Sequence, residues 1–101
     1  RKKVDLSRYF GLQLREAYIS KGNEKKIESI SYRLLNAIKT KNIARFADIL
    51  INSYMYVEKE IPSIFIDTLK DELMLQSYGY GFLLGLQGSN VKNDNESKEE
   101  K

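Results

Sequence analysis

The sequence contains no cysteine and no histidine, and only one proline among its 101 residues. Without cysteine or histidine the chain lacks zinc-finger ligands, a thiol nucleophile and the imidazole of most general-base schemes. No apolar run approaches the roughly 20 residues that span a bilayer, and no signal-peptide pattern is visible. We therefore expect a protein with no membrane partner, in a reducing compartment such as the cytoplasm.

The scarcity of proline and the few strand-like alternations favour an all-α protein. Hydrophobic residues make up 42% of the chain and charged residues 31%, a composition typical of a globular domain. We predict one compact bundle of four to five short helices over residues 1–87, followed by a disordered polar tail over residues 88–101. The predicted helices cover residues 4–20, 24–40, 43–57, 63–69 and about 71–86.

Apolar residues recur at helical spacing in the first three helices. The expected core face of the first helix carries Leu6, Phe10, Leu14 and Ala17, with Tyr9 and Tyr18 at its margins. Its opposite side, with Arg8, Leu12, Arg15 and Ile19, indicates a second contact surface. The core face of the second helix carries Ile27, Ile30, Leu34, Ala37 and Ile38. That of the third carries Ile43, Phe46, Ala47, Leu50, Ile51, Tyr54 and Val57.

The glycine-rich stretch over residues 79–85 does not fit a nucleotide-binding loop. A dinucleotide fingerprint needs glycine where Leu84 stands, and the Gly-Lys-Ser/Thr ending of a phosphate loop is absent. Gly81 and Gly85 are four residues apart on one helix face, so we expect them to let a neighbouring helix or chain pack closely. The carboxylates of the second half show no diagnostic metal spacing, and we predict no metal, no cofactor and no catalytic residue.

Charge is divided unevenly between the halves of the chain. Residues 1–45 hold 12 Lys/Arg and 4 Asp/Glu, whereas residues 46–101 hold 5 and 10. A basic half of this kind is typical of contact with a polyanion, although solvated helix faces and polar protein interfaces carry similar charge. The predicted nucleic-acid-binding residues combine six cations with an exposed tyrosine and an amide: Lys25, Lys26, Arg33, Lys39, Lys41, Arg45, Tyr32 and Asn36.

Such a surface would bind the sugar-phosphate backbone without reading sequence. Each cation near a phosphate releases condensed counterions, which gives sequence-independent affinity. Tyr32 lies on the polar face of the second helix, where an aromatic ring can stack on an unpaired base. No set of base-reading side chains stands on an obvious recognition helix.

Three segments resemble the carboxy-terminal part of the type I-B CRISPR Cascade large subunit, of the Cst type. They are Ile30-Ser31-Tyr32-Arg33-Leu34-Leu35-Asn36-Ala37-Ile38, Arg45-Phe46-x-Asp48-Ile49-Leu50 and Tyr78-Gly79-Tyr80-Gly81-Phe82-Leu83-Leu84-Gly85-Leu86. The resemblance covers roughly residues 11–88. In type I-B systems this segment is also made separately, as the Cascade small subunit.

The resemblance implies a helical, non-catalytic subunit. Such subunits stack head to tail beside the backbone subunits that hold the guide RNA, and they stabilise the R-loop. The implied partners are the large subunit, the backbone subunits, further copies of the chain, the guide RNA–target DNA heteroduplex and the displaced strand. The family's basic surface would correspond here to Lys25, Lys26, Arg33, Lys39, Lys41 and Arg45.

Two other functions stay open at this point. A helical adaptor would bind protein through the same exposed faces, with no nucleic-acid contact. A small DNA-binding transcription regulator would need a recognition helix, and none is convincing. The basic and acidic halves also offer complementary patches for head-to-tail self-association, which would compete for the same lysines.

Overall fold

The computed structural model describes residues 2–68 and 70–88, and every regular element in them is helical. The predicted all-α fold is confirmed. The predicted tail lies outside the described residues, except for Gly88 at its start. The elements are α1 (Lys2–Ser20), α2 (Lys25–Lys39), α3 (Ile43–Tyr56), α4 (Ser63–Thr68), α5 (Glu72–Met74), the π-helical turn η1 (Leu75–Gly79) and α6 (Tyr80–Leu86).

The last three elements follow one another without a break and form one continuous helical segment. Asp71 caps its start, because its side chain accepts a hydrogen bond from the backbone nitrogen of Met74 at 2.9 Å. With this segment counted once, the described residues form five helical segments, in line with the predicted four to five.

The breaks between helices follow from local backbone chemistry. Gly22 has a φ of +76°, a left-handed conformation that ends α1 and that glycine adopts without strain. Asn42 caps α3, and its side chain accepts from the backbone nitrogen of Arg45 at 3.0 Å. Both breaks agree with the predicted boundaries to within one or two residues.

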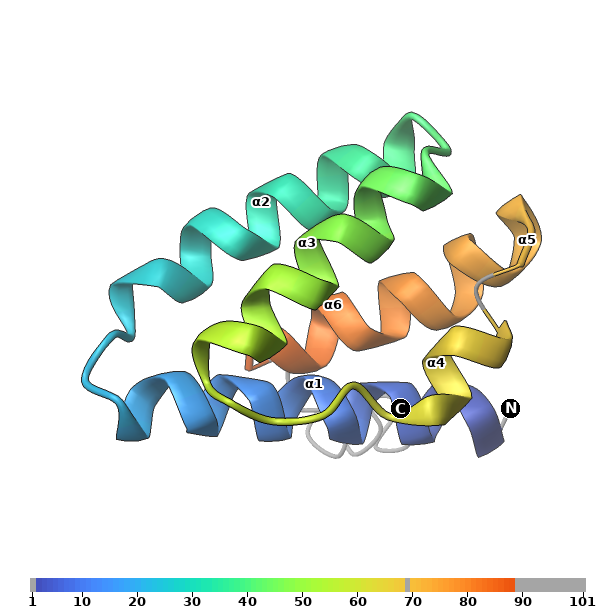
Figure 1. Cartoon of the computed structure of the whole chain (residues 1–101). Helices are drawn as coiled ribbons and strands as arrows, with labels where there is room; N and C mark the ends of the chain where they lie inside the picture. Colours follow the sequence, from blue (N-terminus) through green and yellow to red (C-terminus); the bar gives the residue numbers. More distant parts are fainter. Residues whose placement is uncertain (1, 69, 89–101) are drawn as a thin grey trace, which may run out of the picture.

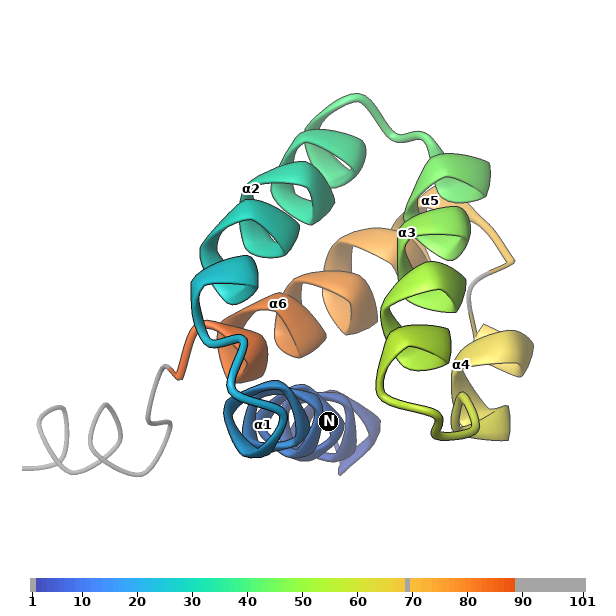
Figure 2. The same ribbon diagram turned by 60° about the vertical axis from the view of Figure 1, so that its left-hand side comes forward.

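Helix α6 lies at the centre of the bundle (Figures 1 and 2). Helices α2 and α3 form an antiparallel hairpin over it, and α1 runs along its other side. Phe82, Leu83 and Leu86 of α6 are each at most 1% exposed. The α4 side chain of Phe65 closes one end of the core, with its ring edge-on to Phe82 at 5.0 Å between centroids.

Helices α1 and α6 approach so closely that their backbones touch. A Cβ at Gly85 would overlap the backbone carbonyl oxygen of Arg8, and a Cβ at Gly11 would overlap that of Phe82. A Cβ at Gly81 would lie 3.2 Å from the carbonyl oxygen of Val4. The predicted packing role of Gly81 and Gly85 is confirmed, and Gly11 adds a third glycine from the opposite helix.

The predicted core face of α1 is partly wrong. Leu6 is 37% exposed, whereas Tyr18, which we placed at the margin together with Tyr9, is 3% exposed; Tyr9 itself is 52% exposed. The glycine contact turns α1 so that Ser7, Gly11, Leu14 and Tyr18 form its buried line. The predicted second contact surface is occupied by α6 at Arg8, Leu12 and Arg15, while Ile19 stays 41% exposed.

The predicted face of α3 also needs one correction. Ile51 is 45% exposed, and Ile49, which the pattern did not select, is 3% exposed. Apolar residues extend around more than half of this helix, so the neighbouring helices decide which of them are covered. Helix α2 packs over Ile49, whereas Ile51 lies on the side of α3 that faces away from α2.

Candidate nucleic-acid interface

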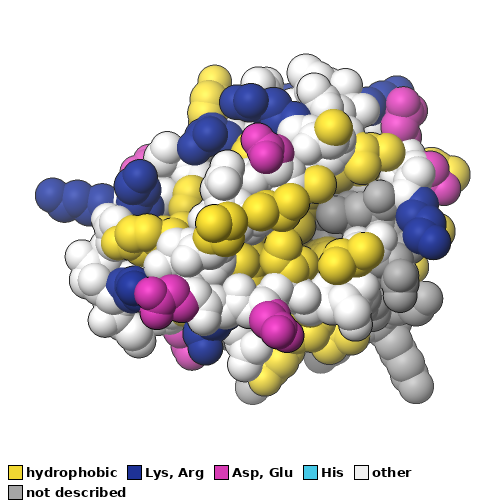
Figure 3. Space-filling view, viewed as in Figure 1, with side chains coloured by type: hydrophobic (Ala, Val, Ile, Leu, Met, Phe, Trp, Pro, Cys, Tyr) yellow, Lys and Arg dark blue, Asp and Glu magenta, His cyan; other side chains and the backbone are white. Residues whose placement is uncertain are grey.

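All eight predicted binding residues lie at the surface, on α2, its turn into α3 and the first turn of α3. Tyr32 is 72% exposed, which agrees with its predicted place on the polar face of α2. Several Lys and Arg side chains gather along the upper part of the face in Figure 3, where α2 lies. Whether these residues act as one binding surface stays a prediction.

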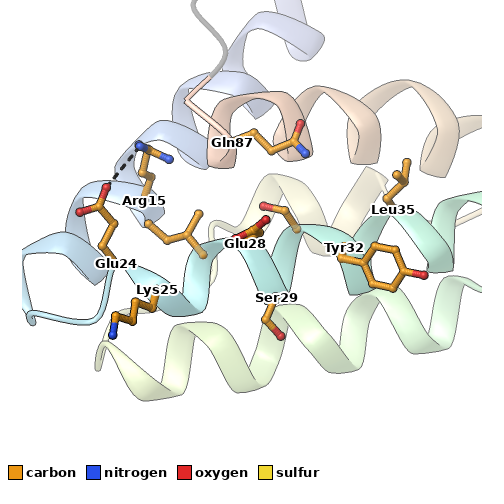
Figure 4. A pocket seen from close by; sticks show the side chains of 10 residues that line it. Arg15, Glu24, Lys25, Glu28, Ser29, Tyr32, Leu35 and Gln87 are labelled. Carbon is orange, nitrogen blue, oxygen red and sulfur yellow. Dashed lines mark ion pairs between the residues drawn. The ribbon is translucent and has the colours of Figure 1, made fainter.

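Two grooves flank α2, and each is lined by two of the predicted residues. The first groove runs between α2, the end of α1 and the end of α6, and has a volume of about 890 Å³. Lys25 and Tyr32 line it from α2, and Gln87 lines it from the end of α6 (Figure 4).

The first groove carries charges of both signs. Glu24 and Glu28 line it together with Lys25 and Arg15. The Arg15 guanidinium is already engaged, because it lies 3.8 Å from the Glu24 carboxylate and donates to the carbonyl oxygen of Leu86 at 3.2 Å. The buried Ser31 hydroxyl on its wall has no hydrogen-bond partner. Two carboxylates make this groove a poor place for a phosphate.

The second groove lies between α2 and α3 and has a volume of about 250 Å³. Lys26 and Arg33 line it from α2, together with Ser29 and Ile30. Its other lining residues are Tyr18, Ile49, Asn52, Ser53 and Tyr56. This lining contains two cations and no carboxylate, whereas Glu24 and Glu28 line the first groove.

Buried hydrogen bonds and ring contacts form the floor of this second groove. Tyr18 donates to the carbonyl oxygen of Ser53 at 3.3 Å, and the Ser53 hydroxyl donates to the carbonyl oxygen of Ile49 at 2.8 Å. Burial raises the pKa of Tyr18, so its hydroxyl stays protonated and keeps this bond at neutral pH. The ring of Tyr56 stacks on that of Tyr18 at 5.1 Å between centroids.

The remaining predicted residues line neither groove. Asn36 and Lys39 are exposed on the last turns of α2, Lys41 has a φ of +57° in the turn, and Arg45 is exposed in the first turn of α3. The two ion pairs among the described residues join Arg8 to Asp5 and Arg15 to Glu24. The six predicted cations therefore have no carboxylate partner within the described part of the chain.

The described residues contain no cluster of three or more His, Cys, Asp or Glu side chains that could hold a metal ion. Among the helices of residues 2–68 and 70–88, none is both long and apolar enough to cross a membrane.

The sequence prediction missed the α3 half of the second groove. Asn52 and Tyr56, which line this groove from α3, are not among the eight predicted binding residues. The signal was their four-residue spacing, which places both on one side of the helix. Ser53 gave no signal, because a serine beside an apolar stripe is common.

Comparisons with protein-family models, curated proteins and solved structures give no match to this chain.

Proposed function

We propose that this protein is a non-catalytic small subunit of a type I-B CRISPR Cascade effector, acting in the cytoplasm. It lines the guide RNA–target DNA complex and stabilises the R-loop through sequence-independent contacts with the DNA backbone. The observation that carries the proposal is the exposed face of α2 with its adjoining turn. This face, the turn and the first turn of α3 carry six exposed cations without carboxylate partners among the described residues, and Tyr32 of α2 is 72% exposed.

The chemistry of this face fits a nucleic-acid backbone. When exposed lysines and arginines contact phosphates, they release counterions that were condensed on the nucleic acid. The entropy of the released ions supplies affinity for any sequence. Tyr32 adds a ring on which an unpaired base can stack. In effectors of this class the guide reads sequence by base pairing and protein handles backbone and shape, which makes a recognition helix unnecessary.

The proposed partners also include the large subunit, the backbone subunits and further copies of this chain. Met55 of α3 and Ile66 of α4 are 68% and 66% exposed, and such apolar side chains suit contact with neighbouring subunits. The exposed Lys39 and Lys41 suit the acidic half of another copy. If so, charge reversal at these two lysines lowers the number of copies in the assembled complex, and an unchanged number contradicts this stacking contact.

The test of the proposed function is R-loop formation by a reconstituted guide-RNA complex on a matched target. The three arms are no small subunit, the wild-type chain, and a chain carrying Lys25→Glu, Lys26→Glu and Arg33→Glu, which leaves the proposed stacking residues Lys39 and Lys41 unchanged. We expect the wild-type chain to restore R-loops and the triple variant to join the complex without restoring them.

A protein-only adaptor makes the opposite prediction for the same experiment. If the triple variant restores R-loops as well as wild type, the basic face does not contact nucleic acid and the adaptor function replaces the proposal. Salt dependence gives a second criterion. Contact with four or five phosphates of a single strand predicts a log–log slope of roughly −3 for binding against salt concentration.

A further inference from the structure

We infer that the groove between α2 and α3 is a phosphate site, which holds one backbone phosphate of a single nucleic-acid strand. This inference rests on the proposed function and assigns its central contact to particular residues. The proposed donors are Lys26 and Arg33 of α2 and Asn52 of α3. Lys25, Tyr32 and the first groove, although on the same helix, take no part in this site.

The antiparallel hairpin brings these donors together. Lys26 and Tyr56 are equally far from the turn at Lys41, and so are Arg33 and Ile49. The groove therefore has one cation at each end. The two cations are seven residues apart, or about 10 Å along the helix axis. Asn52 lies between those ends, on the opposite wall.

Each polar side chain that is free to bind a ligand in this groove can donate a hydrogen bond. Neither Lys26 nor Arg33 has an ion-pair partner within the described residues, and the Asn52 amide makes no side-chain hydrogen bond there. The Tyr56 hydroxyl oxygen accepts from the Asn23 amide at 2.8 Å, which leaves the Tyr56 proton to donate. Hydrogen-bond donors without a nearby carboxylate favour a ligand that can only accept hydrogen bonds. A phosphate diester is such a ligand.

The groove is also held in shape before any ligand arrives. Tyr18 and Ser53 are 3% and 4% exposed and form its floor through the hydrogen bonds described above. Lys21 Nζ lies 5.4 Å from the centre of the Tyr56 ring and adds positive charge at the Lys26 end. A preformed site loses little conformational freedom on binding, and the Arg33 guanidinium can contact two phosphate oxygens at once.

A strand, rather than a free phosphate ion, is the ligand that this surface favours. The groove holds about 250 Å³ and is open at its rim, where both cations are exposed. Further exposed cations follow from Arg33 toward the hairpin turn, at Lys39, Lys41 and Arg45. They would meet the neighbouring phosphates of a strand, and a single ion could not reach them.

The experiment is an NMR titration of the full chain, labelled with ¹⁵N, with an oligothymidylate of ten nucleotides and separately with inorganic phosphate. We expect the strand to shift the Asn52 side-chain amide and the Arg33 Nε–H signals at low salt.

The double variant Lys26→Gln/Arg33→Gln should raise the dissociation constant for the strand about tenfold or more. The matched control Lys59→Gln/Lys70→Gln removes the same charge from exposed positions outside the proposed binding surface, and should change the dissociation constant by less than about threefold. Asn52→Leu removes a donor without changing charge, and should weaken binding several-fold.

Each other outcome overturns a distinct statement. Equal weakening by both double variants, with shifts centred on Tyr32 and Asn36, overturns the groove site and leaves the proposed function standing. Shifts in the groove with phosphate but not with the strand make it a site for a free anion and overturn the strand as ligand. No shift with either, up to millimolar concentrations, overturns the site; the separate R-loop experiment then decides the proposed function.

Discussion

The α1–α6 pair and the α2–α3 pair differ in what lies between their helices. Glycines let the backbones of α1 and α6 touch, with Gly85 against the Arg8 carbonyl and Gly11 against that of Phe82. Between α2 and α3 a groove of about 250 Å³ remains, and its lining includes the charged side chains of Lys26 and Arg33. The first contact has no room for a ligand, and the second presents unpaired donors at its rim. In our proposal, rigidity and binding therefore belong to different helix pairs.

Buried tyrosines connect the two pairs. Tyr18 of α1 donates to the Ser53 carbonyl of α3, and the ring of Tyr54 in α3 lies 6.4 Å from that of Phe82 in α6. The comparison therefore predicts that damage to the α1–α6 contact unfolds the whole bundle, whereas charge removal at the α2–α3 rim leaves the fold intact.

The largest effect is expected from Gly85→Ala. The added Cβ would overlap the Arg8 carbonyl oxygen, a backbone atom that cannot move away without separating α1 from α6. We expect a loss of about 3 kcal/mol in the free energy of unfolding, measured by urea denaturation with circular dichroism.

Gly81→Ala is the matched control on the same helix. Its Cβ would meet the Val4 carbonyl oxygen at 3.2 Å and Val4 Cγ1 at 3.3 Å, a milder contact. The gain of about 1 kcal/mol in helix propensity offsets much of that crowding, so we expect a change within about 1 kcal/mol. Equal losses at both glycines would mean that overlap with the backbone does not control this contact.

Alkaline pH tests the tyrosines that connect the pairs. Burial raises the pKa of Tyr18 and, more strongly, that of Tyr54 above the value of 10.0 for a free tyrosine. The folded state then retains protons that the unfolded state releases, so their contribution to stability is intact below pH 10 and falls above it. The loss should approach about 1.4 kcal/mol per pH unit for Tyr54, whose pKa is strongly raised, and should be smaller for Tyr18.

Denaturant midpoints measured between pH 9 and pH 11.5 check this prediction. Tyr54→Phe removes one of the two tyrosines whose pKa is raised by burial. In this variant the free energy of unfolding should therefore fall less steeply with rising pH. An unchanged pH dependence in this variant would show that Tyr54 does not control it.

A smaller effect is expected where α2 turns into α3. Asn42→Ala removes the side-chain oxygen that accepts from the Arg45 backbone nitrogen at 3.0 Å. We expect a loss of about 1 kcal/mol in the free energy of unfolding. Asn42→Asp keeps a hydrogen-bond acceptor there and should lose much less of the free energy of unfolding. Thermal unfolding monitored by circular dichroism measures both variants. Similar losses in both variants would indicate that the cap does not stabilise the hairpin.

The smallest effect on stability is expected from Lys26→Gln/Arg33→Gln. Both side chains are exposed and have no carboxylate partner among the described residues, so their removal should change the free energy of unfolding by less than about 0.5 kcal/mol. Thermal unfolding monitored by circular dichroism measures this. A large loss would mean that these cations hold the hairpin together, and the contrast between the two helix pairs would fail.

Local signals in the sequence predicted most of the fold. Gly22 and Asn42 mark helix boundaries by backbone conformation and capping, which involve only neighbouring residues. Apolar spacing selected nearly all the buried side chains of α2, because one stripe of that helix faces the core. The spacing of Gly81 and Gly85 predicted close packing, but not the partner.

The faces of α1 and α3 were harder to predict, because apolar residues surround much of each helix. Gly11 turns α1 so that Tyr18 is buried and Leu6 is exposed, and this depends on where α6 docks. Likewise the packing of α2 against α3 covers Ile49 and leaves Ile51 at the surface.

For the candidate site, the sequence by itself determined which cations and aromatic residues α2 presents, because helical periodicity fixes the direction of each side chain around its own axis. It did not determine which of them share a groove. Lys25 and Lys26 are adjacent in the chain but line different grooves, one with carboxylates and one with Asn52 and Tyr56. Only the tertiary structure decided this, since a groove between two helices depends on the register at which they pack, and the periodicity of either helix alone does not contain that register.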